Sequence, residues 1–364
     1  MIGKGRRQAA RQAARGSTNI YITEKYRFQL LVISLVAALL VSMLVSITFG
    51  SVHIDVGTVW RILFYKATGL KHGEWAKSSE QIVWMIRAPR IIFTVLVGGG
   101  LAVIGAVMQA VVRNAMADPY ILGMSAGAST GASFIILSGT LGVLGMWAVS
   151  FAAFLGALAA FSLVFFISSS GGRMTAKKLI LSGVAVSYLF SAVTSFLTYL
   201  APDQGLREVT YWLLGSVASG KWNNLPLPAV IIPAGFMYLF FHARHLNSIS
   251  MGEETAVSLG LDSSAFRKKI FLVTSLMTGV LVALSGSIGF VGLMVPHIVR
   301  LLCGSNHKNL LPLSMLSGAF FLIWADVLAR TILSPMELPI GIITAICGAP
   351  FFIWVLQRSK ETTQ

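Results

Sequence analysis

Charged side chains are scarce in this chain of 364 residues. They make up 11% of the sequence, against 55% hydrophobic residues, whereas soluble domains usually contain about 25% charged residues. So little polar surface excludes a soluble body of this size and indicates a membrane protein with several spans. Acidic residues are rarer than basic ones, 13 against 28. Because the basic residues mostly flank apolar runs, we interpret their excess as the bias that orients membrane spans, and we expect no nucleic-acid partner.

Cysteines and catalytic motifs are also rare. Cys303 and Cys347 have neither a disulfide framework nor metal-ligand spacing. The sequence has no G-x-x-x-x-G-K-[ST] loop for ATP, no G-x-S-x-G and no H-E-x-x-H. We therefore expect a protein that is not itself an enzyme, with no catalytic residue, metal site or cofactor of its own, and we interpret His297 as structural. Few ionisable residues fall inside the apolar runs, which disfavours an ion-coupled carrier but keeps it as the alternative from another class.

Long apolar runs predict an all-α polytopic membrane protein with about ten transmembrane helices, since each crossing needs about 20 residues. The first run is too long for the apolar core of a signal peptide, so we interpret it as a retained span. The run at 270–303 is too long for one helix, and we expect two short helices there. The expected spans are 28–49, 91–112, 119–139, 146–168, 179–200, 225–242, 270–287, 289–303, 310–330 and 340–357.

Ten spans place both termini on one side of the membrane, and the bias of the basic residues predicts that this side is cytoplasmic. We expect a basic cytoplasmic tail at 1–27 that can touch anionic lipid, a transmembrane domain at 28–357 and a short cytoplasmic tail at 358–364.

One cytoplasmic connection, at 242–270, is long enough to carry structure of its own. Glu253 and Glu254 suit the start of a short helix, Gly260 suits its end, and Asp262 can cap a second short helix. Two short helices would form a knob to which a partner docks, although the segment could also be a simple connector.

Several motifs, spread over most of the chain, carry a family resemblance. They are R-A-P-R at 87–90, G-A-V-M-Q at 105–109, R-N-A-M-A-D-P-Y-I-L-G-M-S-A-G at 113–127, G-E-E-T-A-V-S-L-G at 252–260, G-F-V-G-L-M-V-P-H-I-V-R at 289–300, A-D with Arg330 at 325–330, and E-L-P-I-G through G-A-P-F-F at 337–352. From about 28 to 356 the chain resembles the FecCD-type permease family, the membrane subunits of type II ABC importers for ferric siderophores, haem and vitamin B12. The resemblance implies a bundle like the permease of the vitamin B12 importer, in the bacterial cytoplasmic membrane.

The resemblance also implies a machine with several subunits. It implies two ATPase subunits that carry ATP and Mg²⁺, a second permease subunit that is the same or a related chain, and an external substrate-binding protein. The 242–270 loop would then be the coupling element that fits the ATPases. The coupling residues it implies are Gly252, Glu253, Glu254, Ala256, Leu259, Gly260 and Arg267. For the two glutamates, charges that simply face solvent at a helix start are the alternative.

Three arginines match positions at which the family's vitamin B12 importer receives acidic residues of its binding protein. They are Arg87, Arg90 and Arg330, which our topology places near the outer surface. Exposed charges there would steer docking and fix its register. Ordinary interfacial snorkelling is the alternative, and a pairing of Asp326 with Arg330 four residues later would compete with docking.

The gate and the pathway are also implied by the resemblance. Asn114 and Met116 match residues near the inner gate, although the family's proline between them is Ala115 here. The fifth span should line the path. Its hydroxyl-bearing residues are Ser187, Ser191, Thr194, Ser195 and Thr198. They either face a wet path or bond within their own helix. As cargo we expect a ferric siderophore, with vitamin B12 and haem as alternatives.

Overall fold

The computed structural model describes residues 26–361 except 119, 121–122, 141–146, 171 and 173. Within these ranges the chain is helical and has no strand. The basic tail expected at 1–27 therefore lies almost wholly outside the described residues. The elements after the first helix, Tyr26–Ser46, are α2 (Val56–Thr68), α3 (Lys77–Gln81), the π-helix η1 (Ile82–Arg87), α4 (Ala88–Val112), α5 (Met124–Ser138), α6 (Ala148–Ser169), α7 (Ala176–Tyr199), α8 (Asp203–Leu213), the short 3-10 helix η4 (Trp222–Asn224), α9 (Pro226–Phe241), α10 (Ala243–Met251), α11 (Glu253–Ser258), α12 (Ser263–Ser285), α13 (Val291–Cys303), α14 (His307–Thr331) and α15 (Ile340–Glu361).

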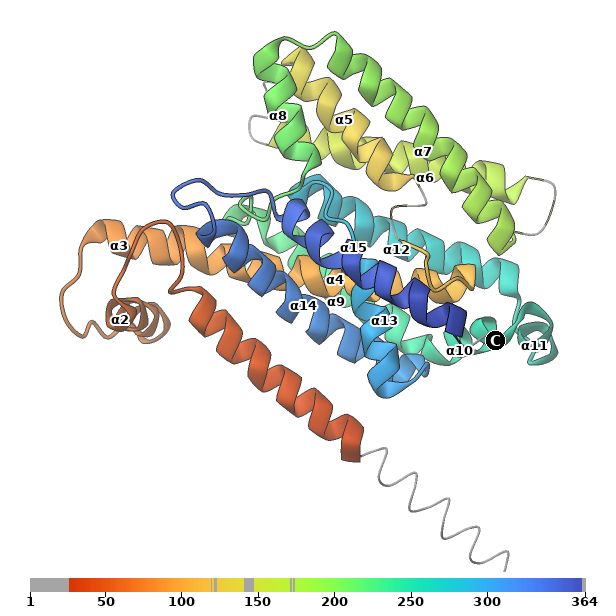
Figure 1. Cartoon of the computed structure of the whole chain (residues 1–364), viewed down its shortest axis with the longest axis horizontal. Helices are drawn as coiled ribbons and strands as arrows, with labels where there is room; N and C mark the ends of the chain where they lie inside the picture. Colours follow the sequence, from red (N-terminus) through yellow and green to blue (C-terminus); the bar gives the residue numbers. More distant parts are fainter. Residues whose placement is uncertain are drawn as a thin grey trace, which may run out of the picture.

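The helix α4 forms the centre of the bundle, and almost every one of its residues is buried. It packs against α14, α13 and α12. Small residues allow these close crossings, because a Cβ atom on Gly98 would overlap the backbone of Gly318, and one on Gly105 would overlap the backbone of Gly292. Helices α5, α6 and α7 form a second group that lies beside this centre (Figure 1).

Polar residues fix where several helices begin. The Asp55 side chain accepts a hydrogen bond from the Thr58 backbone at the start of α2, and Asn306 does the same for Lys308 at the start of α14. Asp262 accepts from the backbones of both Ser264 and Ala265 at the start of α12. These are ordinary N-caps, which satisfy backbone N–H groups that have no partner within the helix.

Each of the ten expected spans coincides with a helix, so the expectation of an all-α polytopic fold is confirmed. Six described helices are long and apolar enough to cross a membrane, and the pair α9 and α10, bent by 59°, is a seventh candidate. Three more, α5, α13 and an apolar stretch of α15, are shorter. The expectation of two short helices at 270–303 is only half right, because α12 extends over 23 residues and only α13 is short.

The bundle has two ends that carry different elements (Figure 1). We call the left end in Figure 1, with α2, α3 and the α14–α15 connection, the α2 end, and the right end, with α10 and α11, the α11 end. At the α11 end the expected second short helix after Asp262 is wrong. Asp262 caps the long α12 instead, and the two short helices are α10 and α11.

Candidate functional sites at the two ends of the bundle

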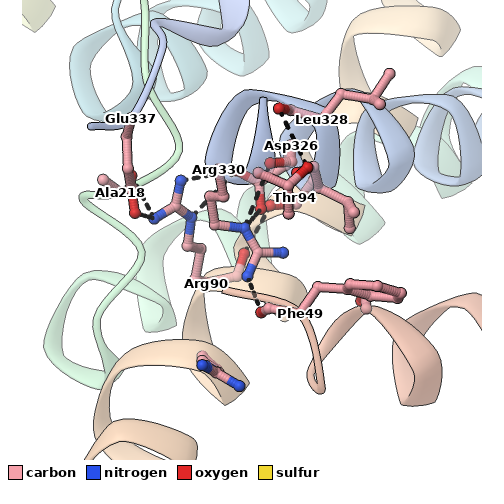
Figure 2. Close-up of polar contacts among 12 residues, drawn as sticks. Phe49, Arg90, Thr94, Ala218, Asp326, Leu328, Arg330 and Glu337 are labelled. Atoms are coloured by element: carbon pink, nitrogen blue, oxygen red, sulfur yellow. Dashed lines mark hydrogen bonds and ion pairs between the residues drawn. The ribbon is translucent and has the colours of Figure 1, made fainter. Parts of the chain in front are cut away.

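A cluster of buried charges lies at the α2 end, between α4 and α14 (Figure 2). The Arg90 guanidinium donates from Nε and Nη2 to Oδ1 of Asp326, at 3.1 and 2.8 Å. Its Nη1 donates to both carboxylate oxygens of Glu337, at 3.1 and 2.8 Å. Arg90 is thus shared between one carboxylate on a neighbouring helix and one on the connection between α14 and α15. Shared, charge-assisted hydrogen bonds of this kind are stronger than neutral ones.

Arg330 and Arg87 complete this arginine cluster. Nε of Arg330 pairs with Oδ2 of Asp326 at 3.0 Å, and its Nη1 donates to the Phe49 carbonyl at 2.9 Å. Nη2 of Arg330 is buried and has no hydrogen-bond partner among the described residues. Arg87 donates to the backbone carbonyls of residues 47, 48 and 52, which connect the first helix to α2.

The structure brings the three predicted arginines together at one end, but it corrects their expected exposure. Arg87, Arg90 and Arg330 retain only 4%, 6% and 3% of their accessible surface. They are not free surface charges, because Asp326 and backbone carbonyls hold them inside the bundle. The pairing of Asp326 with Arg330, the alternative from sequence, is present. Sequence reasoning missed Glu337, although the E-L-P-I-G motif that contains it was the available signal.

An open cavity adjoins the arginine cluster. It has a volume of about 670 Å³ and lies between α8 and the α14–α15 connection. The lining includes Arg207, Glu208 and Tyr211 from α8, and Glu337 and Leu338 from the connection. Glu337 therefore faces both the arginines and the cavity.

At the α11 end, an ion pair between a buried arginine and a partly exposed glutamate fastens α11 to the bundle. Nη1 of Arg267 on α12 lies 3.1 Å from Oε1 of Glu253, the first residue of α11. The Arg267 residue is fully buried. The expectation that Arg267 contacts an ATPase is therefore wrong, because its side chain is enclosed by its own chain. Its role in this structure is to hold α11 in place.

The remaining coupling candidates divide into buried and exposed residues. Gly252 and Gly260, which flank α11, have φ angles of 135° and 79°, where side chains are strained. Ala256 is buried. Glu254 is exposed, and so is Leu259, which keeps 65% of its surface. The exposed residues of α11 are thus acidic and apolar, a combination that suits contact with another protein.

The gate candidates lie in the connection after α4. The Asn114 carboxamide oxygen accepts a hydrogen bond from the Met116 backbone at 2.9 Å, which shapes the turn in place of the family's proline. Both residues are exposed. They therefore form a surface turn, and their role as a gate stays a prediction.

The five pathway candidates on α7 do not share one environment. Thr194 is buried, and its hydroxyl bonds to Thr130 of α5 at 2.7 Å and to the Phe190 carbonyl of its own helix at 3.0 Å, which is the alternative from sequence. Thr198 donates to carbonyls of its own helix, which is the alternative from sequence. Ser191 and Ser195 are exposed, and Ser187 is half-buried. Large apolar residues share this exposed surface. They include Leu181, Tyr188, Leu189, Phe196 and Tyr199.

Comparison with known proteins places the chain among membrane permeases. It is 40% identical to the uncharacterized ABC transporter permease protein YvrB of Bacillus subtilis, over 89% of this chain and 92% of the relative. It is 41% identical to the vitamin B12 import system permease protein BtuC of Klebsiella pneumoniae, over 79% of this chain and 86% of the relative. The hemin transport system permease protein HmuU of Yersinia pestis is 36% identical over 79% of this chain and 87% of its own length.

A solved structure agrees with these relatives. An inward-facing metal-chelate type ABC transporter superposes with a TM-score of 0.77 at 31% identity, covering 90% of this chain and 98% of that one. The model of the FecCD transport family matches residues 38–358, which is most of the chain. With its several apolar spans, this multi-pass membrane protein belongs to the FecCD transport family.

Proposed function

We propose that this chain is the permease subunit of an ABC importer that moves a ferric siderophore across the bacterial cytoplasmic membrane. Separate ATPase subunits supply the energy, and an external binding protein delivers the cargo. The observation that carries this proposal is α11: a short, exposed helix whose first residue, Glu253, pairs with the buried Arg267 of the bundle. The relative YvrB is named as an ABC transporter permease, which supports the permease role. The relative BtuC is named as part of an import system, which supports the direction of transport.

The geometry of α11 suits the transmission of movement. Its exposed face offers Glu254, Val257 and Leu259 to a partner. Behind this face, Ala256 is buried, and Arg267 links the helix to the start of α12. A push on α11 would therefore reach a membrane-spanning helix directly. In this proposal, the ATPase subunits and both termini lie on the cytoplasmic side, at the α11 end.

The α2 end would then face outward and receive the binding protein. Three guanidinium groups meet there with only two carboxylates, Asp326 and Glu337, among the described residues. This imbalance favours an acidic partner, and charge complementarity fixes the register of docking. The buried positions of the arginines mean that few of their donors are directly accessible.

A second permease subunit, the same or a related chain, would cover the exposed surface of α7. Apolar residues and the hydroxyls of Ser191 and Ser195 lie together on this helix. Between two subunits, such a surface would bound a wide path with mixed polarity. Such a path suits a bulky polar chelate.

The proposed cargo belongs to one chemical class, the metal chelates. The structure neighbour is named for this class, which includes ferric siderophores as well as haem and cobalamin. Cobalamin and haem are the competing cargoes, because relatives are named for each of them. Uptake assays in cells with and without this gene separate the three, with ⁵⁵Fe-siderophores, ⁵⁷Co-cobalamin and ⁵⁵Fe-haem as probes. Gene-dependent uptake of a ferric siderophore supports the proposal, whereas uptake of cobalamin or haem alone contradicts the cargo.

The partners are identified by purification. The tagged chain, extracted from its own host's membranes in mild detergent, should carry an ATPase with it. Each external binding protein of the host is then purified and tested against the permease complex in lipid nanodiscs by biolayer interferometry. One binding protein should dock at the α2 end. Docking by none of them would contradict the proposed delivery route.

A further inference from the structure

Glu337 differs from every other member of the arginine cluster in its exposure. Its side chain keeps 38% of its accessible surface, whereas the side chains of Arg90 and Asp326 keep 8% and 2%. Arg330 keeps 3%. Glu337 also comes from the connection between α14 and α15, not from a helix of the core. The cluster therefore has a fixed inner carboxylate, Asp326, and a peripheral outer one.

The two carboxylates are held very differently. Asp326 is held by Arg90 on one oxygen and by Arg330 on the other, so its replacement would break a pair to α4 and an i,i+4 pair within α14. Glu337 bonds only to Nη1 of Arg90 among the polar contacts of the described chain. An ion pair with one partner reachable by water is weak, because solvent screens it and competes for its hydrogen bonds. Glu337 is thus the member that exchanges most easily.

The position of Glu337 also controls access. Arg90 is nearly enclosed, and the face of its guanidinium that points away from Asp326 is covered by the Glu337 carboxylate (Figure 2). A carboxylate from outside the chain can therefore reach Nη1 of Arg90 only by taking the place of Glu337. Nη2 of Arg330, buried without an acceptor among the described residues, shows that the cluster has donor capacity to spare.

Release of Glu337 from Arg90 would also affect the connection between α14 and α15. The connection that carries it also lines the 670 Å³ cavity beside α8. The Met336 backbone donates to the Leu333 carbonyl at 2.9 Å, and the Leu338 backbone donates to the Ala329 carbonyl at 2.9 Å. Between these two backbone bonds, the ion pair with Arg90 fixes the Glu337 side chain at the edge of the cavity.

We propose that Glu337 is an internal stand-in for the carboxylate of the docking protein. It occupies Arg90 in the free permease, and an acidic side chain of the binding protein displaces it on docking. Displacement removes the side-chain tie between the α14–α15 connection and α4 at the edge of the α8 cavity. This inference rests on the proposed docking of a binding protein at the α2 end, and it adds a competitor that makes docking weaker than the arginines alone would allow.

The test compares two variants that each remove one negative charge from the walls of the same cavity. Glu337→Gln removes the competing carboxylate but keeps the side-chain shape. Glu208→Gln is the control, since Glu208 lines the cavity and bonds to Gln204 without contacting the arginines. Docking of the binding protein found in the nanodisc screen is measured by biolayer interferometry. We expect Glu337→Gln to lower Kd about three- to fivefold relative to Glu208→Gln, the scale of a partly exposed ion pair.

A second readout reports on the connection itself and needs no partner. A nitroxide is attached at Met336→Cys, with Cys303 and Cys347 replaced by serine. We expect the label to be more mobile with Glu337→Gln than with Glu208→Gln. We also expect saturating binding protein to shift the spectrum of the protein with Glu337 intact away from its resting form.

The outcomes separate this inference from the proposed function. If the binding protein docks but Glu337→Gln binds no more tightly than Glu208→Gln, the stand-in role is wrong and the proposed function stands. An unchanged label mobility in Glu337→Gln would likewise overturn it. If no binding protein docks to any form, the proposed function itself fails, whatever the spin label shows.

Discussion

At the scale of single residues, buried guanidinium groups connect parts of the bundle at both ends: Arg90 and Arg330 at the α2 end, and Arg267 at the α11 end. The motifs predicted that Arg87, Arg90 and Arg330 gather at one end, and the structure confirms this. They did not predict burial, because an isolated arginine is normally exposed and its cost inside depends on a partner. For Arg90 the partners are 236 and 247 residues away along the chain. Periodicity and hydropathy cannot predict contacts between residues so far apart in the chain.

Arg267 gives a prediction about stability. Arg267→Ala empties the space of a fully buried side chain and detaches the start of α11, so we expect a loss of about 3 kcal/mol, most of it from lost packing because Glu253 reaches water. Thermal unfolding in detergent measures the loss. Lys269→Ala, an exposed residue on the same helix, should behave like the parent protein. Equal stability of the two variants would show that the pair does not anchor α11.

A glycine at the helix crossing gives a second prediction. Gly105→Ala places a methyl group on the backbone carbonyl of Gly292, so α4 and α13 must separate. We expect destabilisation of about 3 kcal/mol or more, at or above the top of the usual cost of overpacking. Gly289→Ala is the control, because a Cβ atom there meets nothing within 4 Å. Fluorescence-detected size-exclusion chromatography after heating should show early aggregation for Gly105→Ala alone.

At the scale of elements, hydropathy predicted where the spans lie but not the residues at which their helices begin and end. α12 begins at Ser263 because Asp262 caps it there, so polar residues continue the helix outside the apolar run. α13 is short because its start at Phe290 has a left-handed backbone. The helices α2 and α8 do not span, so a search for long apolar runs could not predict them. Nothing in the run lengths revealed that α10 bends away from α9.

The element α11 gives a prediction about coupling. Glu254→Lys and Leu259→Asp change exposed residues of α11, so we expect each to weaken ATPase binding about tenfold, which corresponds to about 1.4 kcal/mol. Co-purification of the ATPase with the tagged permease measures this. Changes at Glu253 are a poorer test, because they also break the pair with Arg267. Ser305→Asp, an exposed change elsewhere at the α11 end, is the control. Full ATPase recovery with both α11 variants would contradict the coupling role.

At the scale of the whole molecule, the two ends of the bundle carry different structures. At the α11 end, the buried Arg267 holds the exposed helix α11. At the α2 end, arginines and carboxylates form a buried cluster in which only Glu337 is partly exposed. The dense packing around α4 connects them, since α4 contacts both α14 and α12. The family resemblance predicted one end for coupling and one for docking, and both functional assignments stay predictions. It could not supply Glu337 or the internal role of Arg267, because both depend on contacts within this particular fold.

The central claim is that the chain transports its cargo only when a partner ATPase hydrolyses ATP. The most direct measurement is uptake of radioactive ferric siderophore under two conditions. In one, cells are depleted of ATP while the ion gradient is maintained, and in the other the gradient is collapsed while ATP is held. We predict that gene-dependent uptake disappears on ATP depletion and persists without the gradient. Uptake that disappears with the gradient and persists without ATP would contradict the account and favour an ion-coupled carrier.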